Sequence, residues 1–311
     1  MTGTGSDSCT AVIGNVRMTL YTHHPAREAQ GLMLMCHGNS GNAEALRDFA
    51  LPLSERLGLI IVAPLFDRKR FPPVAYQRGH ITDGHGRPRP PEQWATRLVP
   101  ALIDWALDGG SLPYWLWGFS AGAQFLSRVA AFQPLRIAPE RIVIVSPSVH
   151  VQPLLGRWPS GEAAPYGLGG VFHGDEEQEV QRRYLERPVT LCVGAEDHEA
   201  TDPTLGRNRA ARRQGPDRLA RAARTFDLGA MTALRLGCDF GWQLKIVPGV
   251  GHSARDMLEP LRAMAIMDLL PETRPEAQRL REGLPFELVP GRRSGPKIRV
   301  GGRWFDLPRK S

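Results

Sequence analysis

A serine between two glycines is the feature of this sequence whose residue types and spacing could most readily do chemistry. The stretch GFSAG, residues 118–122, follows the apolar run YWLW and precedes a helix-like pattern. Ser120 is therefore expected where a strand turns into a helix. A serine there either caps the helix or acts as a nucleophile. Small residues on both sides let strand and helix approach closely, and the helix N-terminus favours developing negative charge.

A nucleophilic Ser120 needs a base, because a serine hydroxyl is a weak nucleophile at neutral pH. Gly-x-Ser-x-Gly between a strand and a helix is the nucleophile elbow of α/β hydrolases, in which the acid and then the histidine follow the serine. The histidines after Ser120 are His150, His173, His198 and His252. His252 is the strongest candidate, since it follows the last expected strand and precedes the last expected helix.

The other histidines fit the role of the base less well. His150 and His173 lie in an irregular segment, where they could line a pocket. His198 is next to an acidic residue, but it follows the wrong strand for the base. An alternative for His252 is a capping or surface histidine, which would leave the serine without an obvious base.

The acid that orients the base is expected after the strand Val189–Val193. The sequence there continues GAEDHEATDPTL. Asp197 lies a few residues beyond the strand end and is the preferred candidate, with Glu196 and Asp202 as competitors. Taken alone, Asp197 could simply be a turn-forming aspartate. The order Ser120, Asp197, His252 favours the catalytic interpretation.

Acyl transfer also needs donors for the oxyanion. One donor is expected to be the backbone N–H of Ala121, directly after the serine. The second is expected from HGNSGN, residues 37–42, which follows a buried strand. We assign it to the amide of Asn39, with Ser40 as the alternative. His37 precedes the serine and is expected to be structural.

These residues need a scaffold, and the alternation of short apolar runs with helix-like segments predicts an α/β fold with a mostly parallel sheet and helices on both faces. Strands are expected over Val16–Tyr21, Leu32–Cys36, Leu59–Ala63, Tyr114–Trp117, Arg141–Val145, Val189–Val193 and Gln243–Val247. Helices are expected over Asn42–Leu57, Glu92–Leu107, Ala121–Phe132, 205–235 and Ala254–Leu270. Residues 147–187 are expected to form an irregular, cap-like insertion.

The sequence predicts a catalytic domain over residues 1–270 and a C-terminal extension over 271–311. KIRV-GG-RWFD in the extension is typical of a β-hairpin, because a Gly-Gly loop suits tight primed turns. Residues 292–310 hold seven Lys and Arg against Asp306 alone, a net +6 of the chain's +7. We expect the hairpin to pack on the body or add to a sheet edge, and we do not expect it to bind nucleic acid.

Composition narrows the class of protein further. The chain has 311 residues, of which 42% are hydrophobic, as in globular proteins. It contains no apolar run of the roughly 20 residues that span a membrane. Its N-terminus lacks the pattern of a secretory signal. The four cysteines form no CxxC pair. We expect a cytoplasmic protein with no metal and no cofactor, since neither HExxH nor GxGxxG occurs in a suitable context.

The sequence resembles the α/β hydrolases related to polyhydroxybutyrate depolymerases and similar esterases. The resemblance rests on GFSAGAQFLSRVAAF, PYGLGG, GAEDHEATDPTL, RQGPDRLARAARTF and VPGVGH, with PLFD and FPPVAY further upstream, and it covers roughly residues 30–268. It implies a Ser–Asp–His triad on Ser120, Asp197 and His252, and an oxyanion amide after the His-Gly step. The N-terminal segment and the basic tail depart from it. No appended polymer-binding domain is recognisable, which disfavours an extracellular polyester as substrate.

The expected function is therefore a serine hydrolase that acts on small carboxylic esters. We expect the pocket wall to include Phe66 and Tyr76 from one loop, and Trp158 and Tyr166 from the insertion. A peptidase or thioesterase with the same triad is the alternative among enzymes. A binding protein that retains the fold is the alternative outside them. The sequence carries no signal for an oligomeric state.

Overall fold

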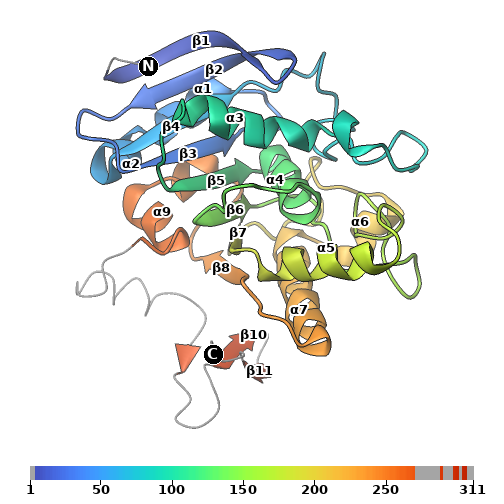
Figure 1. Cartoon of the computed structure of the whole chain (residues 1–311). Helices are drawn as coiled ribbons and strands as arrows, with labels where there is room; N and C mark the ends of the chain where they lie inside the picture. The colour runs from blue at the N-terminus through green and yellow to red at the C-terminus, as the bar shows by residue number, and fades with distance from the viewer. Residues whose placement is uncertain (1–3, 270–287, 290–296, 301–302, 307–311) are drawn as a thin grey trace.

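The computed structural model describes residues 4–269, 288–289, 297–300 and 303–306 of the chain. Residues 4–269 contain one eight-stranded sheet with the order β1-β2-β4-β3-β5-β6-β7-β8 (Figure 1). The strands are β1 (Gly5–Ile13), β2 (Val16–His24), β3 (Gly31–Cys36), β4 (Leu59–Pro64), β5 (Tyr114–Phe119), β6 (Arg141–Val145), β7 (Val189–Gly194) and β8 (Gln243–Val247). β2 pairs antiparallel with β1 and β4, and the other neighbouring pairs are parallel. The expectation of a mostly parallel sheet is confirmed.

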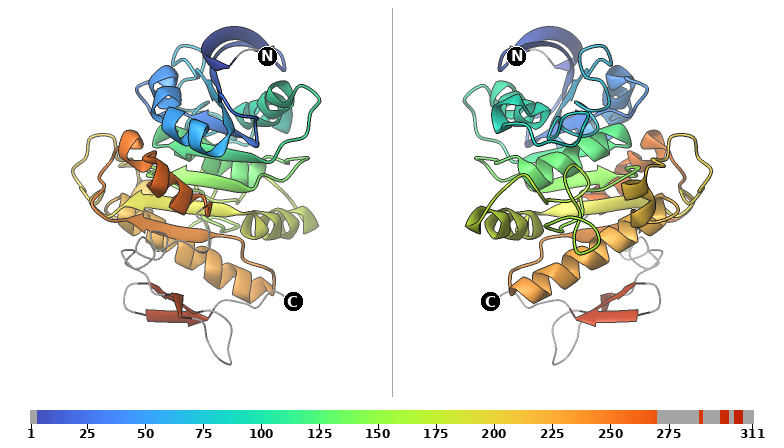
Figure 2. Two further views of the ribbon diagram at one scale, coloured as in Figure 1. Left: turned by 90° about the vertical axis from the view of Figure 1, so that its left-hand side faces the viewer. Right: turned by 90° about the vertical axis from the view of Figure 1, so that its right-hand side faces the viewer.

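The helices lie on both faces of this sheet, as the side views in Figure 2 show. They are α1 (Ala43–Phe49), α2 (Leu51–Leu57), α3 (Leu98–Leu107), α4 (Ala121–Phe132), α5 (Asp175–Glu186), α6 (Arg209–Gln214), α7 (Arg218–Leu236), α8 (Ala254–Met257) and α9 (Pro260–Ile266), with short 3-10 turns η1 (Pro91–Gln93) and η2 (Ala95–Arg97). Side chains of α1, α2, α8 and α9 share one hydrophobic cluster, and those of α3, α4, α5 and α7 share another.

The central strands are apolar throughout because their side chains enter both clusters in alternation. In β3, Leu32 and Leu34 pack with α3 and α4, whereas Met33 and Met35 pack with α1 and α9. All six residues of β3 are buried. The two layers of helices thus explain the continuous hydrophobic runs of the sequence.

Proline divides three helices that the sequence predicts as continuous. Pro52 lies in the first turn of α2, Pro216 lies between α6 and α7, and Pro260 begins α9. Proline lacks the amide proton that a helix interior needs, but it is well tolerated in a first turn. The periodicity on either side therefore belongs to two helices in each case. The segment predicted as a helix over Glu92–Leu107 is likewise shorter, since two 3-10 turns precede α3.

Two strands or helices within residues 4–269 were not predicted from the sequence. β1 forms a hairpin with β2 and is largely exposed, so its residues carry no apolar run. α5 lies within residues 147–187, the segment expected to be irregular. Its residues are mostly charged, and few of them face the core, so its helical periodicity is weak.

Both strands of the predicted C-terminal hairpin are present in the structure. β10 (Lys297–Val300) pairs antiparallel with β11 (Arg303–Asp306), and β9 (Leu288–Val289) pairs with β10. The Gly-Gly turn, the Leu270 boundary and most of the extension predicted over 271–311 lie outside the described residues.

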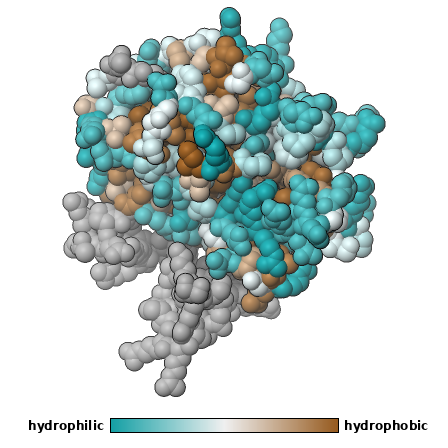
Figure 3. All heavy atoms as spheres, viewed as in Figure 1, coloured by the Kyte–Doolittle hydropathy of each residue, from teal (hydrophilic) through white to brown (hydrophobic). Residues whose placement is uncertain are grey.

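The face seen in Figure 3 is mostly hydrophilic, with hydrophobic residues in small groups. Large hydrophobic side chains that remain exposed on α7 are Met231 and Leu234. Among the helices that the structure describes, none is both long enough and apolar enough to cross a lipid bilayer.

Candidate active site

Ser120 lies at a sharp turn between β5 and α4. Its backbone has φ +53° and ψ −107°, a conformation that residues other than glycine rarely adopt. Backbone contacts explain the two flanking glycines. A Cβ on Gly122 would lie 2.1 Å from the carbonyl oxygen of Cys36, and a Cβ on Gly118 would lie 2.6 Å from that of Gly122. The amide of Ser120 donates to the carbonyl of Val145 in β6 at 2.9 Å, which ties the turn to the sheet.

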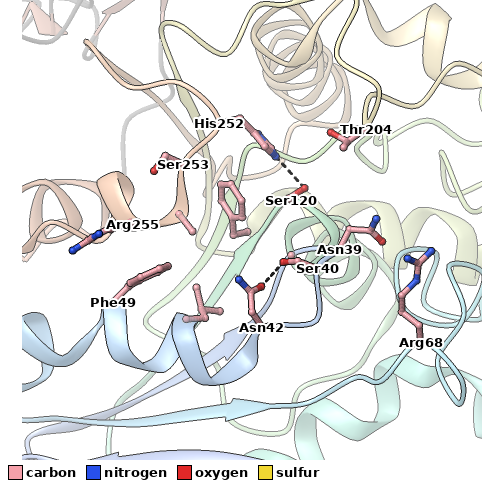
Figure 4. A pocket seen from close by; sticks show the side chains of 14 residues that line it. Asn39, Ser40, Asn42, Phe49, Arg68, Ser120, Thr204, His252, Ser253 and Arg255 are labelled. Atoms are coloured by element: carbon pink, nitrogen blue, oxygen red, sulfur yellow. Dashed lines mark hydrogen bonds between the residues drawn. The ribbon is translucent and has the colours of Figure 1, made fainter.

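Three side chains that are far apart in the sequence form a hydrogen-bonded chain at this turn. His252 Nε2 lies 3.2 Å from the Ser120 hydroxyl, and His252 Nδ1 lies 2.8 Å from Asp197 Oδ2 (Figure 4 draws the first contact). Ser120 follows β5, Asp197 follows β7 and His252 follows β8. Because these strands are parallel, their carboxyl ends lie at one edge of the sheet. An Nδ1 proton donated to the carboxylate leaves Nε2 free to accept the serine proton.

Asp197 is buried and is bound by a cation as well as by His252. Its Oδ1 accepts a hydrogen bond of 3.0 Å from Arg218, which is 1% exposed. Arg218 also donates to Asp202 at 2.7 Å and to the Thr204 hydroxyl at 2.6 Å. Burial acts to raise the pKa of Asp197, but the hydrogen bond with His252 and the attraction of His252 and Arg218 outweigh it and lower the pKa. The carboxylate is therefore ionised at neutral pH.

The other acids and histidines considered from the sequence lie elsewhere. The side chains of His198 and Glu196 are both largely exposed and are 3.9 Å apart. His173 is exposed. His150 is buried, with its backbone amide and carbonyl bound to the side chain of a glutamine in α6. Asp202 binds the buried guanidinium of α7 rather than the imidazole. Within residues 4–269, the structure thus brings Asp197 and His252, and not these alternatives, to the serine.

The loop after β3 packs on the serine turn. A Cβ on Gly38 would lie 3.5 Å from the ring of Phe119 and 3.8 Å from the Cβ of Ser120. His37 is buried, and its Nε2 accepts a hydrogen bond of 3.0 Å from the backbone amide of Phe66. Its Nδ1 must therefore carry the proton and donate to the Gly38 carbonyl at 2.7 Å. Burial lowers the pKa of His37 despite the opposing effect of this hydrogen bond, so the ring is neutral and positions the loop.

The amides expected to act as oxyanion donors belong to the same region. Ala121 is the first residue of α4, so its N–H lies in the first turn, where the helix itself supplies no acceptor. Asn39 and Ser40 line the cavity beside the serine. The side chain of Asn39 accepts a hydrogen bond from Gln77 at 3.3 Å, and the hydroxyl of Ser40 donates to Asn42. These contacts hold both side chains within the loop.

A cavity of about 590 Å³ opens beside Ser120 and His252 (Figure 4). Its apolar wall is formed by Leu46, Phe49, Phe119 and Ala254. Asparagine and hydroxyl side chains from the loops after β3, β7 and β8 supply polar groups. Two arginines, Arg68 and Arg255, also line it, and none of its lining residues is an Asp or Glu.

The four residues predicted to line the pocket do not line this cavity. Phe66 and Tyr76 are buried, stack on each other with ring centroids 4.6 Å apart, and pack against Phe125 of α4. The hydroxyl of Tyr76 donates to the carbonyl of His37 at 2.7 Å. Both aromatic residues therefore support the loop from behind, where they border a smaller hollow.

The side chains of Trp158 and Tyr166 also contact other residues and do not line this cavity. The indole of Trp158 lies 4.9 Å from the guanidinium of Arg213, which in turn binds Glu162. The hydroxyl of Tyr166 accepts a hydrogen bond from Asn208 at the start of α6. The insertion thus packs against α6.

Several residues of the site were not predicted from the sequence. Leu46 and Phe49 come directly after the HGNSGN loop, and Arg255 comes three residues after His252, so proximity in the sequence was an available signal. Arg218 had no local signal, since its burial and its contact with Asp197 depend on how α7 packs. No group of three or more His, Cys, Asp or Glu that could hold a metal ion occurs among the residues that the structure describes.

Comparison with known proteins finds solved structures of similar fold. No family model and no curated protein sequence matches the chain. Among solved structures it is similar to LpqC, a poly(3-hydroxybutyrate) depolymerase from Bordetella parapertussis, with 28% identity, a TM-score of 0.73, and coverage of 89% of this chain and 95% of that one. It is also similar to poly(aspartic acid) hydrolase-1 from Sphingomonas sp. KT-1, with 26% identity, a TM-score of 0.74, and coverage of 84% and 98%.

Proposed function

We propose that this chain, which has the α/β-hydrolase fold, is a serine hydrolase that cleaves carboxylic esters through an acyl-enzyme. Ser120 is the nucleophile, His252 is the base, and Asp197 orients the base. The observation that supports this most directly is the chain of hydrogen bonds, 3.2 Å and 2.8 Å long, that joins the three side chains at the strained turn. Of the two similar structures described above, one is named as a depolymerase and the other as a hydrolase.

In the first half of the reaction, His252 Nε2 takes the hydroxyl proton of Ser120 as its oxygen attacks the acyl carbon. The tetrahedral intermediate collapses when the imidazolium gives that proton to the leaving alcohol, and the acyl group remains on the serine. In the second half, His252 takes a proton from water, which attacks the acyl-enzyme. The acid is released, and the proton returns to Ser120. Asp197 stabilises the imidazolium in both halves.

The oxyanion is bound by the amides of Ala121 and Asn39, with Ser40 as the alternative to Asn39. The amide of Ala121 lies at the N-terminus of α4, where the helix dipole adds to the attraction. A donor of this kind typically contributes about 2.7–4 kcal/mol of transition-state stabilisation.

The test is hydrolysis of short and medium p-nitrophenyl esters by the wild type and by Ser120→Ala. Loss of the nucleophile is expected to lower kcat by about 10⁴-fold or more. Ser160→Ala is the matched control, since Ser160 is exposed and contacts only a backbone carbonyl among the described residues. An active Ser120→Ala enzyme would refute the assignment.

Amide hydrolysis is a second candidate, because one similar structure is named for poly(aspartic acid), whose repeats are joined by amide bonds. The same nucleophile and base can cleave esters, thioesters and amides. A p-nitroanilide and a thioester with the same acyl group as the preferred p-nitrophenyl ester distinguish these classes. A kcat/KM for the anilide close to that for the ester would favour the amidase.

A binding protein that retains the fold predicts a different result. Such a protein would neither hydrolyse esters nor react with a fluorophosphonate probe. If the probe labels Ser120 but no ester is hydrolysed, Ser120 is an activated nucleophile and the substrate belongs to another class.

A further inference from the structure

Two arginines of the cavity beside Ser120 have no acidic partner. Arg68 lies in the loop after β4, and Arg255 lies in α8. Neither makes an ion pair or a side-chain hydrogen bond with another residue that the structure describes, although Arg70, two residues from Arg68, pairs with Asp67 at 2.6 Å. An unpaired guanidinium in a ligand cavity is suited to bind a carboxylate or another planar anion.

The carboxylates that touch the cavity wall do not neutralise these arginines. Asp197 contacts His252, and Asp202 contacts Thr204, but both carboxylates are bound to the buried Arg218. The lining of the cavity contains no Asp or Glu, and its basic side chains are the two arginines and His252. The two arginines therefore offer the cavity positive charge that a neutral ester would not use.

The arginines lie at opposite ends of the cavity, with the serine between them (Figure 4). Arg68 is beside Asn39 at the polar end. Arg255 is beside Phe49 at the apolar end, and its guanidinium lies 5.8 Å from the centre of that ring. The ring orients the cation at the wall by a cation–π contact. A carboxylate on either side of the scissile bond can thus meet a cation.

On the basis of the ester hydrolysis proposed above, we infer that the site prefers anionic esters, whose acyl group or alcohol carries a carboxylate that Arg68 or Arg255 binds. The two arginines determine specificity, and neither takes part in bond cleavage. The carboxylate adds binding to both the ground state and the transition state, so its main effect is on KM.

Two matched pairs of esters test this inference. Mono-p-nitrophenyl glutarate and p-nitrophenyl pentanoate differ in a carboxylate on the acyl side. p-Acetoxybenzoate and p-acetoxybenzamide differ in a carboxylate on the alcohol side. Each is assayed with the wild type, Arg68→Gln, Arg255→Gln and Lys69→Gln. Lys69 is an exposed cation next to Arg68 that does not line the cavity, so it controls for a general effect of charge.

The expected result is a kcat/KM about fivefold or more in favour of the anionic member of at least one pair, an effect in the range of charge-assisted contacts at partly exposed sites. Arg68→Gln or Arg255→Gln abolishes this preference, whereas Lys69→Gln retains it. Raising the ionic strength to about 1 M shortens the screening length to about 3 Å and reduces the preference.

Equal kcat/KM for both members of both pairs, in an enzyme that hydrolyses them through Ser120, overturns the inference and leaves the proposed function standing. A preference that survives in both arginine variants also overturns it. Failure to hydrolyse any of the four esters, together with an unreactive serine, overturns the proposed function and the inference with it.

Discussion

Arg218 and His252 share the carboxylate of Asp197. The guanidinium lies 3.0 Å from Oδ1, and the imidazole lies 2.8 Å from Oδ2. Asp197 and Arg218 are 4% and 1% exposed, so the ion pair is almost fully shielded from water. Because Arg218 also binds Asp202 and Thr204, it joins the loop after β7 to α7. The buried cation thus helps to orient the acid, and together with His252 it lowers the pKa of the carboxyl group.

Replacement of Arg218 by Met should be strongly destabilising. It leaves two carboxylates without their partner, and breaking a buried pair typically costs about 3–5 kcal/mol. The folded-state pKa of Asp197 is lowered, so its stabilising effect is present above its ordinary pKa and is lost as the pH falls through the folded value. The difference between wild type and variant should therefore shrink in acid.

Urea unfolding at several pH values measures this difference. Arg224→Met is the control, because Arg224 is exposed on the same helix. Its replacement should change the free energy of unfolding by less than about 0.5 kcal/mol. A similar small effect for Arg218→Met would contradict the role assigned to the buried pair.

The kcat of Asp197→Asn should distinguish Asp197, as the acid that orients His252, from the neighbouring acidic residues. The neutral amide cannot stabilise an imidazolium as a carboxylate does, so kcat is expected to fall by about 10⁴-fold. Glu196→Gln should change kcat by less than about twofold, because the side chain of Glu196 is 61% exposed. Comparable losses in both variants would argue that the acid has been misassigned.

Gly122→Ala should disrupt the serine turn. The new Cβ would lie 2.1 Å from the backbone carbonyl oxygen of Cys36, which cannot move without displacing β3. Overpacking of this kind costs about 1–3 kcal/mol or more, and esterase activity should fall with it. Gly84→Ala is the control, since its Cβ would meet no atom within 4 Å. Thermal unfolding of the two variants is the measurement, and equal Tm values would refute the steric argument.

His150 should make the fold sensitive to acid. Burial lowers its pKa to about 3 from an ordinary 6.5, with a further contribution from the charges of Arg128 and Arg221. The unfolded chain therefore binds a proton that the folded chain does not between these two values. As the pH is lowered through this window, the free energy of unfolding should decrease. This residue contributes up to about 1.4 kcal/mol per pH unit to the decrease.

His150→Leu should remove that part of the slope. Any packing cost of the substitution is independent of pH, so the difference from wild type should be constant above pH 7 and change only below about 6.5. Denaturant titrations from pH 8 to about 4.5 provide the comparison. Parallel curves for the two proteins throughout this range would exclude His150 as the source.

The sequence alone determined the elements whose signals are local. A glycine two residues before and after Ser120 reflects contacts between adjoining segments of chain, and the apolar runs reflect strands that are buried on both faces. The order of serine, acid and histidine was taken from the chain order that accompanies the Gly-x-Ser-x-Gly motif. The largely exposed β1, the charged α5 and the helices divided by proline were missed because their patterns are weak or interrupted.

Only the tertiary structure decided which side chains meet. Asp197, Glu196 and Asp202 lie on one loop, and the sequence does not distinguish their roles. The packing of α7 places Arg218 against two of them, Asp197 and Asp202. Aromatic residues were expected to line the pocket, yet Phe66 and Tyr76 stack behind the loop, whereas Phe49, Arg68 and Arg255 reach the cavity. The reason is that a side chain's direction and its neighbours depend on how distant elements pack, which the residue type does not encode.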